Sequence, residues 1–471
     1  MDELPSVGIE NKSRIVSRQD FLNLAYFLSL AGLSACVPKI ISDMLATPAV
    51  GSNQSETGNL PNQVTKPELQ KDIPIGPQLD VPDFTQVQEM RKFETNSSWN
   101  ADQLQQQLQE AVKKSVEKNR EIVVDLPKGE TIIDRQITCT IPEGAKITLR
   151  GHTEGSRLKL HSSLSNVSKE WGSFAQKNML YFKDMEGELT INGVEFHGGS
   201  ERAGSGGYIA PASPWDAVVL IVGSGEGDKT DPAMHRIGKR KGKANVKFCG
   251  FYQSESEGIM MQNLKSAGMQ NCWGRNLDVL FNASWCDSVS SRNVTGENFT
   301  SDGTYITSAQ NVELSNWHIK TARQGYDLQG VANAVLNECH AYDCGYSYAI
   351  SRSETDRKTW SGAITLNNCH SRDCQIVYAL GLIERLQVNR ANHDGIGKWY
   401  LKYLENDFLH KDGIRNPESI FAYNAPVLVY PTDGVYMKSG IYNDVKIRLS
   451  SLQKPEYKIH QFPGITYSRE G

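Results

Sequence analysis

The chain has 471 residues, of which 39% are hydrophobic and 22% are charged, and its formal net charge is -4 at pH 7. This length allows one large domain with additional segments. The nearly balanced charge gives no indication of nucleic-acid binding, which usually needs a strongly basic surface. The modest hydrophobic content also excludes a protein with many membrane spans, because each span needs an apolar stretch of about 20 residues.

Residues 1–36 have the order of a bacterial export signal. Three basic residues precede the apolar stretch FLNLAYFLSLAGLSAC, which ends in small residues and Cys36. This stretch is too short for a comfortable membrane span, whereas the order basic, apolar, small is typical of a signal. Residues 33–36, LSAC, resemble the lipobox of bacterial lipoproteins, in which the cysteine is lipidated. We predict an exported protein, in the periplasm or at the cell surface, anchored through Cys36; the alternative is a buried helix of a cytosolic protein.

The next segment, residues 37–85, contains seven prolines among many Ser, Asn, Gln and Thr residues. This composition buries too little apolar surface to order itself, so we predict a disordered linker. The folded part is then expected over residues 86–396. Residues 397–471 would add further coils or cap the fold.

The folded part is expected to begin with one amphipathic helix. Residues 100–119 open with Asn100, which can cap a helix, and place apolar residues such as Leu104 and Leu108 at helical spacing. Three strand-like runs separated by turns follow at 121–134, 135–151 and 156–161. A helix before short strands would cover the open end of a strand stack, where backbone groups are otherwise exposed.

A polar segment at residues 223–248 interrupts the strand-like sequence. Its basic residues are Lys239, Arg240, Lys241 and Lys243. If this loop overhangs a binding groove, it would attract an acidic polysaccharide; otherwise it is a solvated loop.

A short repeat occupies residues 289–396. Its clearest copies are NVELSNWHIKTARQGYDL at 311–328, NAVLNECHAYDCGYSYAI at 333–350 and AITLNNCHSRDCQIVY at 363–378, and weaker copies begin at 289 and 386. When Gly303, Gly325, Gly345, Gln375 and Gly395 are taken as equivalent, the steps are 22, 20, 30 and 20 residues. Units of this length with short alternating strands are typical of a solenoid whose unit is one coil of β-strands.

We therefore predict an all-β protein, a right-handed single-stranded parallel β-helix with an N-terminal capping α-helix. Asparagines are expected at one turn of successive coils, because this residue tolerates the left-handed conformation. The residues expected there are Asn293, Asn316, Asn337 and Asn368.

The cysteines of the repeat should form columns, with Cys339 above Cys369 and Cys344 above Cys374. Neighbouring coils lie about 4.8 Å apart, which allows a disulfide between Cys344 and Cys374. We favour the alternative, an inward row of free thiols. The repeated Cys-His-x-x-Asp-Cys motif could suggest zinc, but repetition at the coil period explains it, so no metal ligands are assigned.

The start of the folded part resembles the pectate lyase superfamily and phage tailspikes, in which a helix leads into an LPxG pattern and then LxG. Residues 126–129, LPKG, and 149–151, LRG, carry the match. With the later coils, the resemblance covers residues 95–396. It implies the parallel β-helix fold but no single activity, because the superfamily contains lyases, hydrolases, epimerases and non-catalytic sugar binders.

Residues 300–330 also resemble polygalacturonases between their NTDG and GDDC motifs. Asp302 and Gly303 match the first motif. At the second motif the sequence reads ARQG over residues 322–325, and residues 343–345 read DCG where that family has Gly-His-Gly. The resemblance therefore does not imply polygalacturonase chemistry.

In the aligned repeats, side chains that could transfer protons fall in two neighbouring columns. One column holds Ser301, Arg323, Asp343, Asp373 and His393, and the next holds Asp302, Gln324, Cys344, Cys374 and Asp394. The following strand carries the tyrosines Tyr305, Tyr326, Tyr346, Tyr348 and Tyr378. Polar groups beside aromatic rings that can stack on sugars predict a saccharide groove.

This alignment places Asp302 and Asp343 two coils apart, about 9 to 10 Å along the axis, with Arg323 between them. That is near the carboxyl separation of inverting glycosidases, about 6.5 to 9.5 Å, whereas Asp343 and Asp373 on adjacent coils would be nearer the roughly 5 Å of retaining ones. The alternative for each aspartate is a turn cap.

The sequence thus predicts an exported enzyme that cleaves a polysaccharide, as a hydrolase or a lyase. Catalysis is assigned to Asp302, Arg323 and Asp343, and substrate binding to Gln324, Tyr326, Tyr346, Asp373 and His393. A lyase would use Arg323 as its base and Ca²⁺ held by aspartates; no other cofactor is expected. The alternative is a non-catalytic carbohydrate-binding or cell-envelope β-helix protein. The expected partner is a polysaccharide, with no nucleic acid and no membrane contact beyond the lipid anchor.

Overall fold

A computed structural model describes residues 94, 99–161, 178–199, 217–224, 240–254, 256–352, 360–398, 426–429, 437–451 and 462–469. Cys36, the predicted linker at 37–85 and part of the basic loop, including Lys239, lie outside these residues. Among the described residues, no helix is long and apolar enough to cross a membrane.

The helix α3 (Ala101–Lys118) covers the first coil and confirms the predicted capping helix. Its N-terminus is closed by a capping box, in which Asn100 Oδ1 accepts from Gln103 N (3.0 Å) and Gln103 Oε1 accepts from Asn100 N (2.8 Å). Leu104 is buried, and Ser115 Oγ accepts from Lys146 N at 2.8 Å. The helix therefore covers apolar side chains and pairs with backbone groups at the open end of the stack.

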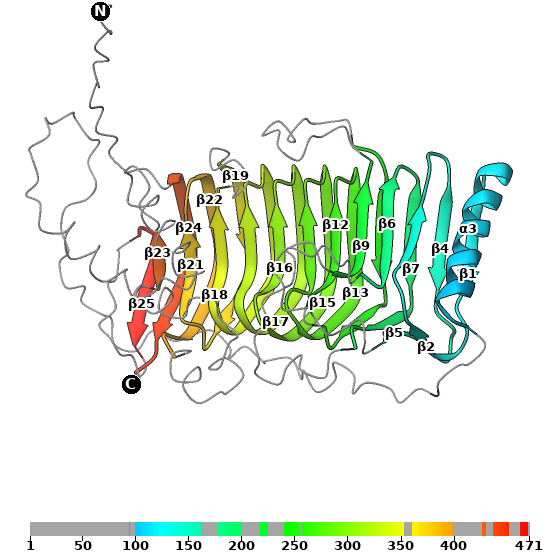
Figure 1. The fold of residues 1–471 in the computed structure, drawn as a ribbon. Helices are drawn as coiled ribbons and strands as arrows, with labels where there is room; N and C mark the ends of the chain where they lie inside the picture. The colour runs from blue at the N-terminus through cyan, green and yellow to red at the C-terminus, as the bar shows by residue number, and fades with distance from the viewer. Residues whose placement is uncertain are drawn as a thin grey trace, which may run out of the picture. The chain divides into compact units, whose positions relative to one another are not determined.

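The other described elements form three parallel sheets along one axis, and successive coils follow one another from α3 to β25 (Figure 1). The first sheet contains β1 (Glu121–Asp125), β4 (Lys146–Arg150), β7 (Glu188–Asn192), β10 (Lys243–Lys247) and β19 (Ser361–Asn367). The second contains β2 (Gly129–Ile133), β5 (Ser156–Leu160), β8 (Val194–His197), β11 (Gly250–Tyr252), β20 (Ser371–Arg372) and β25 (Ile465–Arg469). The third contains β3 (Ile137–Thr140), β6 (Leu180–Met185), β9 (Ala217–Gly223), β12 (Glu257–Gln262), β14 (Phe281–Ser284), β16 (Asp302–Thr307), β21 (Ile376–Leu380) and β23 (Val427–Val429).

The longer strands bend from one sheet into the next. They are β13 (Ser266–Leu277), β15 (Ser288–Phe299), β17 (Asn311–Gln329), β18 (Asn333–Ser351), β22 (Ile383–Ile396) and β24 (Met437–Leu449). Every pairing between these strands is parallel. The predicted parallel β-helix is therefore confirmed, and β24 and β25 continue it beyond residue 396.

Each coil turns at residues in the left-handed conformation. At the first turn they include Phe248, Asn271, Asn293, Asn316, Glu338, Asn368, Arg390 and Asp444; at the second, Gln253, Asn276, Asn298, Thr321, Asp343 and Asp373; at the third, Asn263, Trp285, Ser308 and Leu382. The turn positions predicted for Asn293, Asn316 and Asn368 are confirmed. The prediction for Asn337 is wrong by one residue, because Glu338 has the positive φ of 53°.

Asn337 instead begins an amide ladder along the first turn. Asn367 Nδ2 donates to Asn337 Oδ1 (2.9 Å), Asn389 Nδ2 to Asn367 Oδ1 (2.7 Å) and Asn443 Nδ2 to Asn389 Oδ1 (2.7 Å). An amide carries both a donor and an acceptor, so identical residues in one column can bond in series. The amide ladder links four successive coils by side-chain hydrogen bonds.

The predicted cysteine columns are confirmed as rows of free, buried thiols. Cys344 N lies 3.4 Å from Cys374 Sγ, and Cys249 N lies 3.5 Å from Cys272 Sγ on earlier coils. Burial raises the pKa of the Cys344 thiol well above its usual range. These thiols therefore serve as small apolar groups of the core.

A stack of tyrosines fills the interior of the later coils. The ring centroids of Tyr326 and Tyr348 are 5.3 Å apart, and those of Tyr348 and Tyr378 are 5.8 Å apart. The Tyr348 hydroxyl lies 2.6 Å from the carbonyl oxygen of Cys339 and 3.0 Å from that of His370. It thus reaches across the core from the third sheet to the second and shares its one proton between two carbonyls.

We expect Tyr348→Phe to lower the free energy of unfolding by about 1 to 3 kcal/mol, because two buried carbonyls lose this donor. Urea unfolding monitored by circular dichroism would measure the change. Tyr181→Phe, at a half-buried position outside the core stack, is the matched control and should change stability by less than about 0.5 kcal/mol. Equal effects of the two substitutions would contradict the proposed contribution of the hydroxyl.

Candidate functional site

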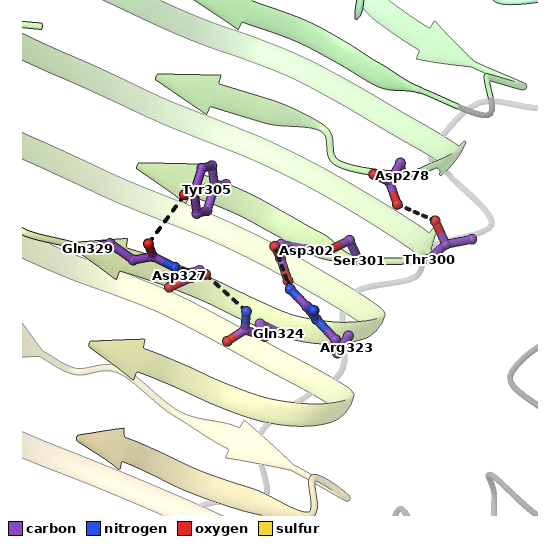
Figure 2. Close-up of polar contacts among 9 residues, drawn as sticks. All are labelled: Asp278, Thr300, Ser301, Asp302, Tyr305, Arg323, Gln324, Asp327 and Gln329. Atoms are coloured by element: carbon purple, nitrogen blue, oxygen red, sulfur yellow. Dashed lines mark hydrogen bonds and ion pairs between the residues drawn. The ribbon is translucent and has the colours of Figure 1, made fainter. Parts of the chain in front are cut away.

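Two predicted catalytic residues, Asp302 and Arg323, lie together on the outer side of the third sheet (Figure 2). Arg323 Nη2 donates to both carboxylate oxygens of Asp302, at 3.1 and 3.2 Å. Ser301 Oγ donates to Asp302 Oδ2 at 3.1 Å. Asp302 is only 3% exposed, whereas the Arg323 side chain is 28% exposed. The guanidinium is therefore the more accessible partner of a largely buried carboxylate.

A second carboxylate, Asp327, is held by amides on the next coil (Figure 2). Its Oδ2 atom accepts from Gln324 Nε2 and Gln329 Nε2, each at 2.9 Å. Gln329 Oε1 in turn accepts from the Tyr305 hydroxyl at 3.2 Å. Two glutamines thus orient a carboxylate that is 2% exposed.

A third carboxylate, Asp278, lies one coil before Asp302. The backbone N–H groups of Ser301 and Asp302 donate to the Asp278 carbonyl oxygen at 3.0 and 3.2 Å. The Thr300 hydroxyl donates to Asp278 Oδ1 at 2.6 Å. Asp278, Asp302 and Asp327 therefore occupy three consecutive coils; together with Arg323 we call them the carboxylate cluster.

Arg323 remains charged in this cluster. Burial by itself would lower its pKa, but attraction to Asp302 and Asp327 and the hydrogen bonds with Asp302 outweigh burial and raise the pKa. A guanidinium that keeps its proton cannot abstract one from a substrate. This disfavours the predicted role of Arg323 as the base of a lyase; the charge suits it to balancing carboxylates.

The predicted pairing of Asp302 with Asp343 is also wrong, because the repeats align differently. β17 and β18 pair at a constant step of 22 residues, so that Gln324 faces Tyr346. Gly325 therefore does not correspond to Gly345. Asp343 lies at the second turn with φ 52°, in the column of Thr321 and away from the column of Asp302.

Three other predicted residues lie away from the carboxylate cluster. Tyr326 is part of the interior tyrosine stack and is 0% exposed, so it cannot bind a polysaccharide. His393 is 2% exposed because its column is that of Ser371, whose Oγ lies 2.7 Å from His393 Nδ1. Asp373 is a turn residue whose carboxylate pairs with Lys398 at 3.3 Å. The substrate-binding roles of Tyr326 and His393 are therefore wrong.

One predicted binding residue, Gln324, contacts the cluster through Asp327. Tyr346 shares the column of Asp302 and Gln324, one coil beyond Gln324. The sequence prediction missed Asp278, Asp327 and Gln329. An alignment anchored on Asn311 and Asn333 would have kept the step of 22 between β17 and β18 and placed Gln324 beside Tyr346.

The side chains of the repeated Cys-His-x-x-Asp-Cys motif point to both the inner and the outer side of the coil. Cys339 and Cys344 belong to the core, whereas the stacked ring of His340 lies on the outer side of the second sheet. Within the described ranges, no group of three or more His, Cys, Asp or Glu side chains is placed to hold a metal ion. The structure therefore assigns no ligands for zinc or for Ca²⁺.

No family model and no curated protein matches this chain. Among solved structures, the catalytic domain of a GH87 alpha-1,3-glucanase variant in complex with tetrasaccharides is similar over 84% of this chain and 70% of that chain. The sequence identity is 11% and the TM-score is 0.33. A similarity of this degree leaves the reaction to be inferred from the residues of this chain.

We expect Arg323→Met to lower the free energy of unfolding by about 3 to 5 kcal/mol at pH 7, because Asp302 would keep a buried charge without this partner. Chemical unfolding would measure the loss. Adding Asp302→Asn should restore part of the stability, since it removes the uncompensated charge. Strictly additive losses in the double variant would show that the two side chains do not interact.

Proposed function

We propose that this protein is a glycoside hydrolase that cleaves a polysaccharide at the carboxylate cluster. The observation that carries this proposal is the set of three aspartates on consecutive coils around one arginine, on the outer side of the third sheet (Figure 2). Glycoside hydrolysis needs two carboxyl groups, one acting as an acid and the other as a base or nucleophile.

The contacts divide these roles among the aspartates. Asp302 is bonded to a guanidinium that stays protonated, which suits it to the ionised role. Asp327 accepts two amide hydrogen bonds at one oxygen, an arrangement that also suits a carboxylate. Asp278 accepts from a neutral hydroxyl, and we assign it the role of the acid that protonates the leaving sugar.

Neighbouring groups supply what a sugar chain would need beside these carboxylates. Tyr305 is half-buried, and its ring can stack on the apolar face of a sugar while its hydroxyl bonds Gln329. The Gln324 amide can pair with sugar hydroxyls. Because the raised pKa of Arg323 disfavours its use as a base, hydrolysis is favoured over elimination.

The test is release of new reducing ends from a panel of neutral and acidic polysaccharides. We expect Asp302→Asn and Asp278→Asn each to reduce the rate at least about 100-fold, because each removes a proton-transferring or charge-stabilising group. Asp343→Asn is the matched control and should retain activity, since asparagine also tolerates the left-handed turn.

Three other outcomes would contradict the proposed reaction or its assigned residues. An ultraviolet-absorbing unsaturated product would show a lyase and contradict hydrolysis. Binding of a polysaccharide with no product, and unchanged in Asp302→Asn, would favour a non-catalytic carbohydrate-binding protein. If Asp343→Asn lost activity while keeping its fold, Asp343 would have to be counted among the catalytic residues again.

We further propose that the chain is exported and anchored through a lipid on Cys36. The order of basic, apolar and small residues supports this proposal. Cys36→Ala should prevent lipidation and leave the N-terminal segment uncleaved, which cell fractionation and intact mass would reveal. An unchanged location with the wild-type N-terminus intact would contradict it.

A further inference from the structure

Four histidines lie close together on successive later coils. His318, His340 and His370 stack on the outer side of the second sheet, with ring centroids 5.0 Å apart at each step. His393 lies on the next coil inside the core, with its ring 6.3 Å from that of Tyr348. We call these four residues the histidine ladder.

Two rings of the ladder join one coil to the next through their Nδ1 atoms. His340 Nδ1 accepts from His370 N at 3.3 Å, and His370 Nδ1 accepts from Asn392 N at 2.9 Å. These bonds lie where the second sheet is weakest, because β20 consists of only Ser371 and Arg372. Imidazole lone pairs here take the place of backbone carbonyls as acceptors.

The buried member of the ladder makes two further contacts between strands. His393 Nδ1 lies 2.7 Å from Ser371 Oγ, and His393 Nε2 lies 2.7 Å from the Tyr378 hydroxyl. It therefore links β22 to β20 and β21 inside the core. A proton added to the neutral ring would place a positive charge inside the core and reverse one of these two hydroxyl hydrogen bonds.

We propose that the histidine ladder is an acid-sensitive clasp that holds the coils between residues 337 and 396 together and opens them when the imidazoles take up protons. A protonated Nδ1 can no longer accept from His370 N or Asn392 N. Imidazolium rings 5.0 Å apart would also repel one another.

The pKa values agree in sign with this mechanism. Burial and the neighbouring His318 and His370 lower the pKa of His340 to about 3. Burial also lowers the pKa of His318, His370 and His393. An unfolded histidine has a pKa of about 6.5, so the open coils bind more protons, and opening becomes easier as the pH falls from about 6.5 toward 3.

The titratable groups on the neighbouring strands and turns are Glu297 of β15, Lys320 of β17, Glu338 and Tyr342 of β18, Arg372 of β20, the turn residue Asp373, Asp394 of β22, and Lys446 and Arg448 of β24. Glu338 opposes the effect, because it raises the pKa of His370. Glu297 and Asp394 are paired with Lys320 (3.8 Å) and Arg448 (2.5 Å). In these two pairs opposite charges lie beside each other on neighbouring coils.

Opening is expected to remain local. Each coil of a solenoid contacts only its neighbours, so one group of coils can open while distant coils stay folded. The first coils, β1 to β8, carry His152, His161 and His197 but no stack of imidazoles across successive coils among their described residues. They therefore provide an internal reference.

The experiment is hydrogen–deuterium exchange of the full chain at pH 7 and about pH 4.5, corrected for intrinsic exchange rates. Protection of peptides from residues 337–396 should fall about 100-fold for each histidine that titrates. The reason is that pH 4.5 lies about two units below the pKa of about 6.5 of an unfolded histidine. Peptides from 121–160 should keep theirs. His340→Gln combined with His370→Gln should lose less protection in residues 337–396 at pH 4.5 than the wild type, since two titrating rings are removed and a glutamine carbonyl can accept the same N–H groups; His393 remains and still contributes its own loss. His152→Gln, at an exposed position, should behave like the wild type.

Equal protection of 337–396 at the two pH values would overturn the clasp, and so would an even loss over all coils. If the double variant fails to fold, nitrogen-15 spectra of the wild-type histidines decide the question. Ladder rings that stay neutral until exchange protection is lost support the clasp. Rings that titrate near pH 6.5 in the folded protein would overturn it.

Discussion

The constraint on which this structure depends is the in-register stacking of parallel coils. Strands of neighbouring coils lie about 4.8 Å apart, so a residue is always beside the residue of the same column. A column of asparagines gains from this, because each amide donates to the next, as in Asn337, Asn367, Asn389 and Asn443. A column of thiols packs as apolar volume. The type of side chain in a column therefore determines whether stacking stabilises or destabilises the solenoid.

Charged columns cannot stack in this way without a partner. The carboxylate cluster avoids direct repetition because Asp302 is followed by Gln324 in its column, and Arg323 lies beside both. Each carboxylate then has its own donor: a guanidinium, a pair of amides or a hydroxyl. Such an arrangement brings three acids together without placing identical charges in register, which is the condition for dividing acid and base roles between them.

Much of the fold could be predicted from the sequence, because it depends on local signals. The capping box at Asn100, the turn asparagines such as Asn293 and the paired cysteines all mark their positions through their own chemistry. The site was harder to predict, because its residues depend on register. Gly325 was matched with Gly345, yet a Cβ at Gly325 would lie 2.9 Å from the backbone oxygen of Ser347 and 3.0 Å from Ala341 Cβ. That glycine is required by core packing, which the sequence does not display.

Matching Gly325 with Gly345 misaligned the repeats by two residues. This misalignment explains both the false and the missed site assignments. The shift placed His393 in the column of the turn residue Asp373, so it was expected outside, but it lies beside Ser371 in the core. Asp327 lies three positions after Gln324. It was not assigned to the site, because the aligned tyrosines led to the choice of Tyr326, its inward neighbour. In a solenoid the inward or outward direction of a side chain follows from register, and register is fixed by contacts between coils.

β17 connects the two chemical features of the later coils. It carries His318 in the second sheet and Gln324 and Asp327 in the third, with Thr321 at the turn between them. β18 repeats this order with His340 and Tyr346. A change in the spacing of these two coils at the histidine ladder would therefore reach the amides that orient Asp327 through one turn of each strand. Because β18 pairs with β17 along its whole length, we expect opening of the ladder at β18 to loosen the edge of the carboxylate cluster nearest to it, while the coils before β16 stay in place.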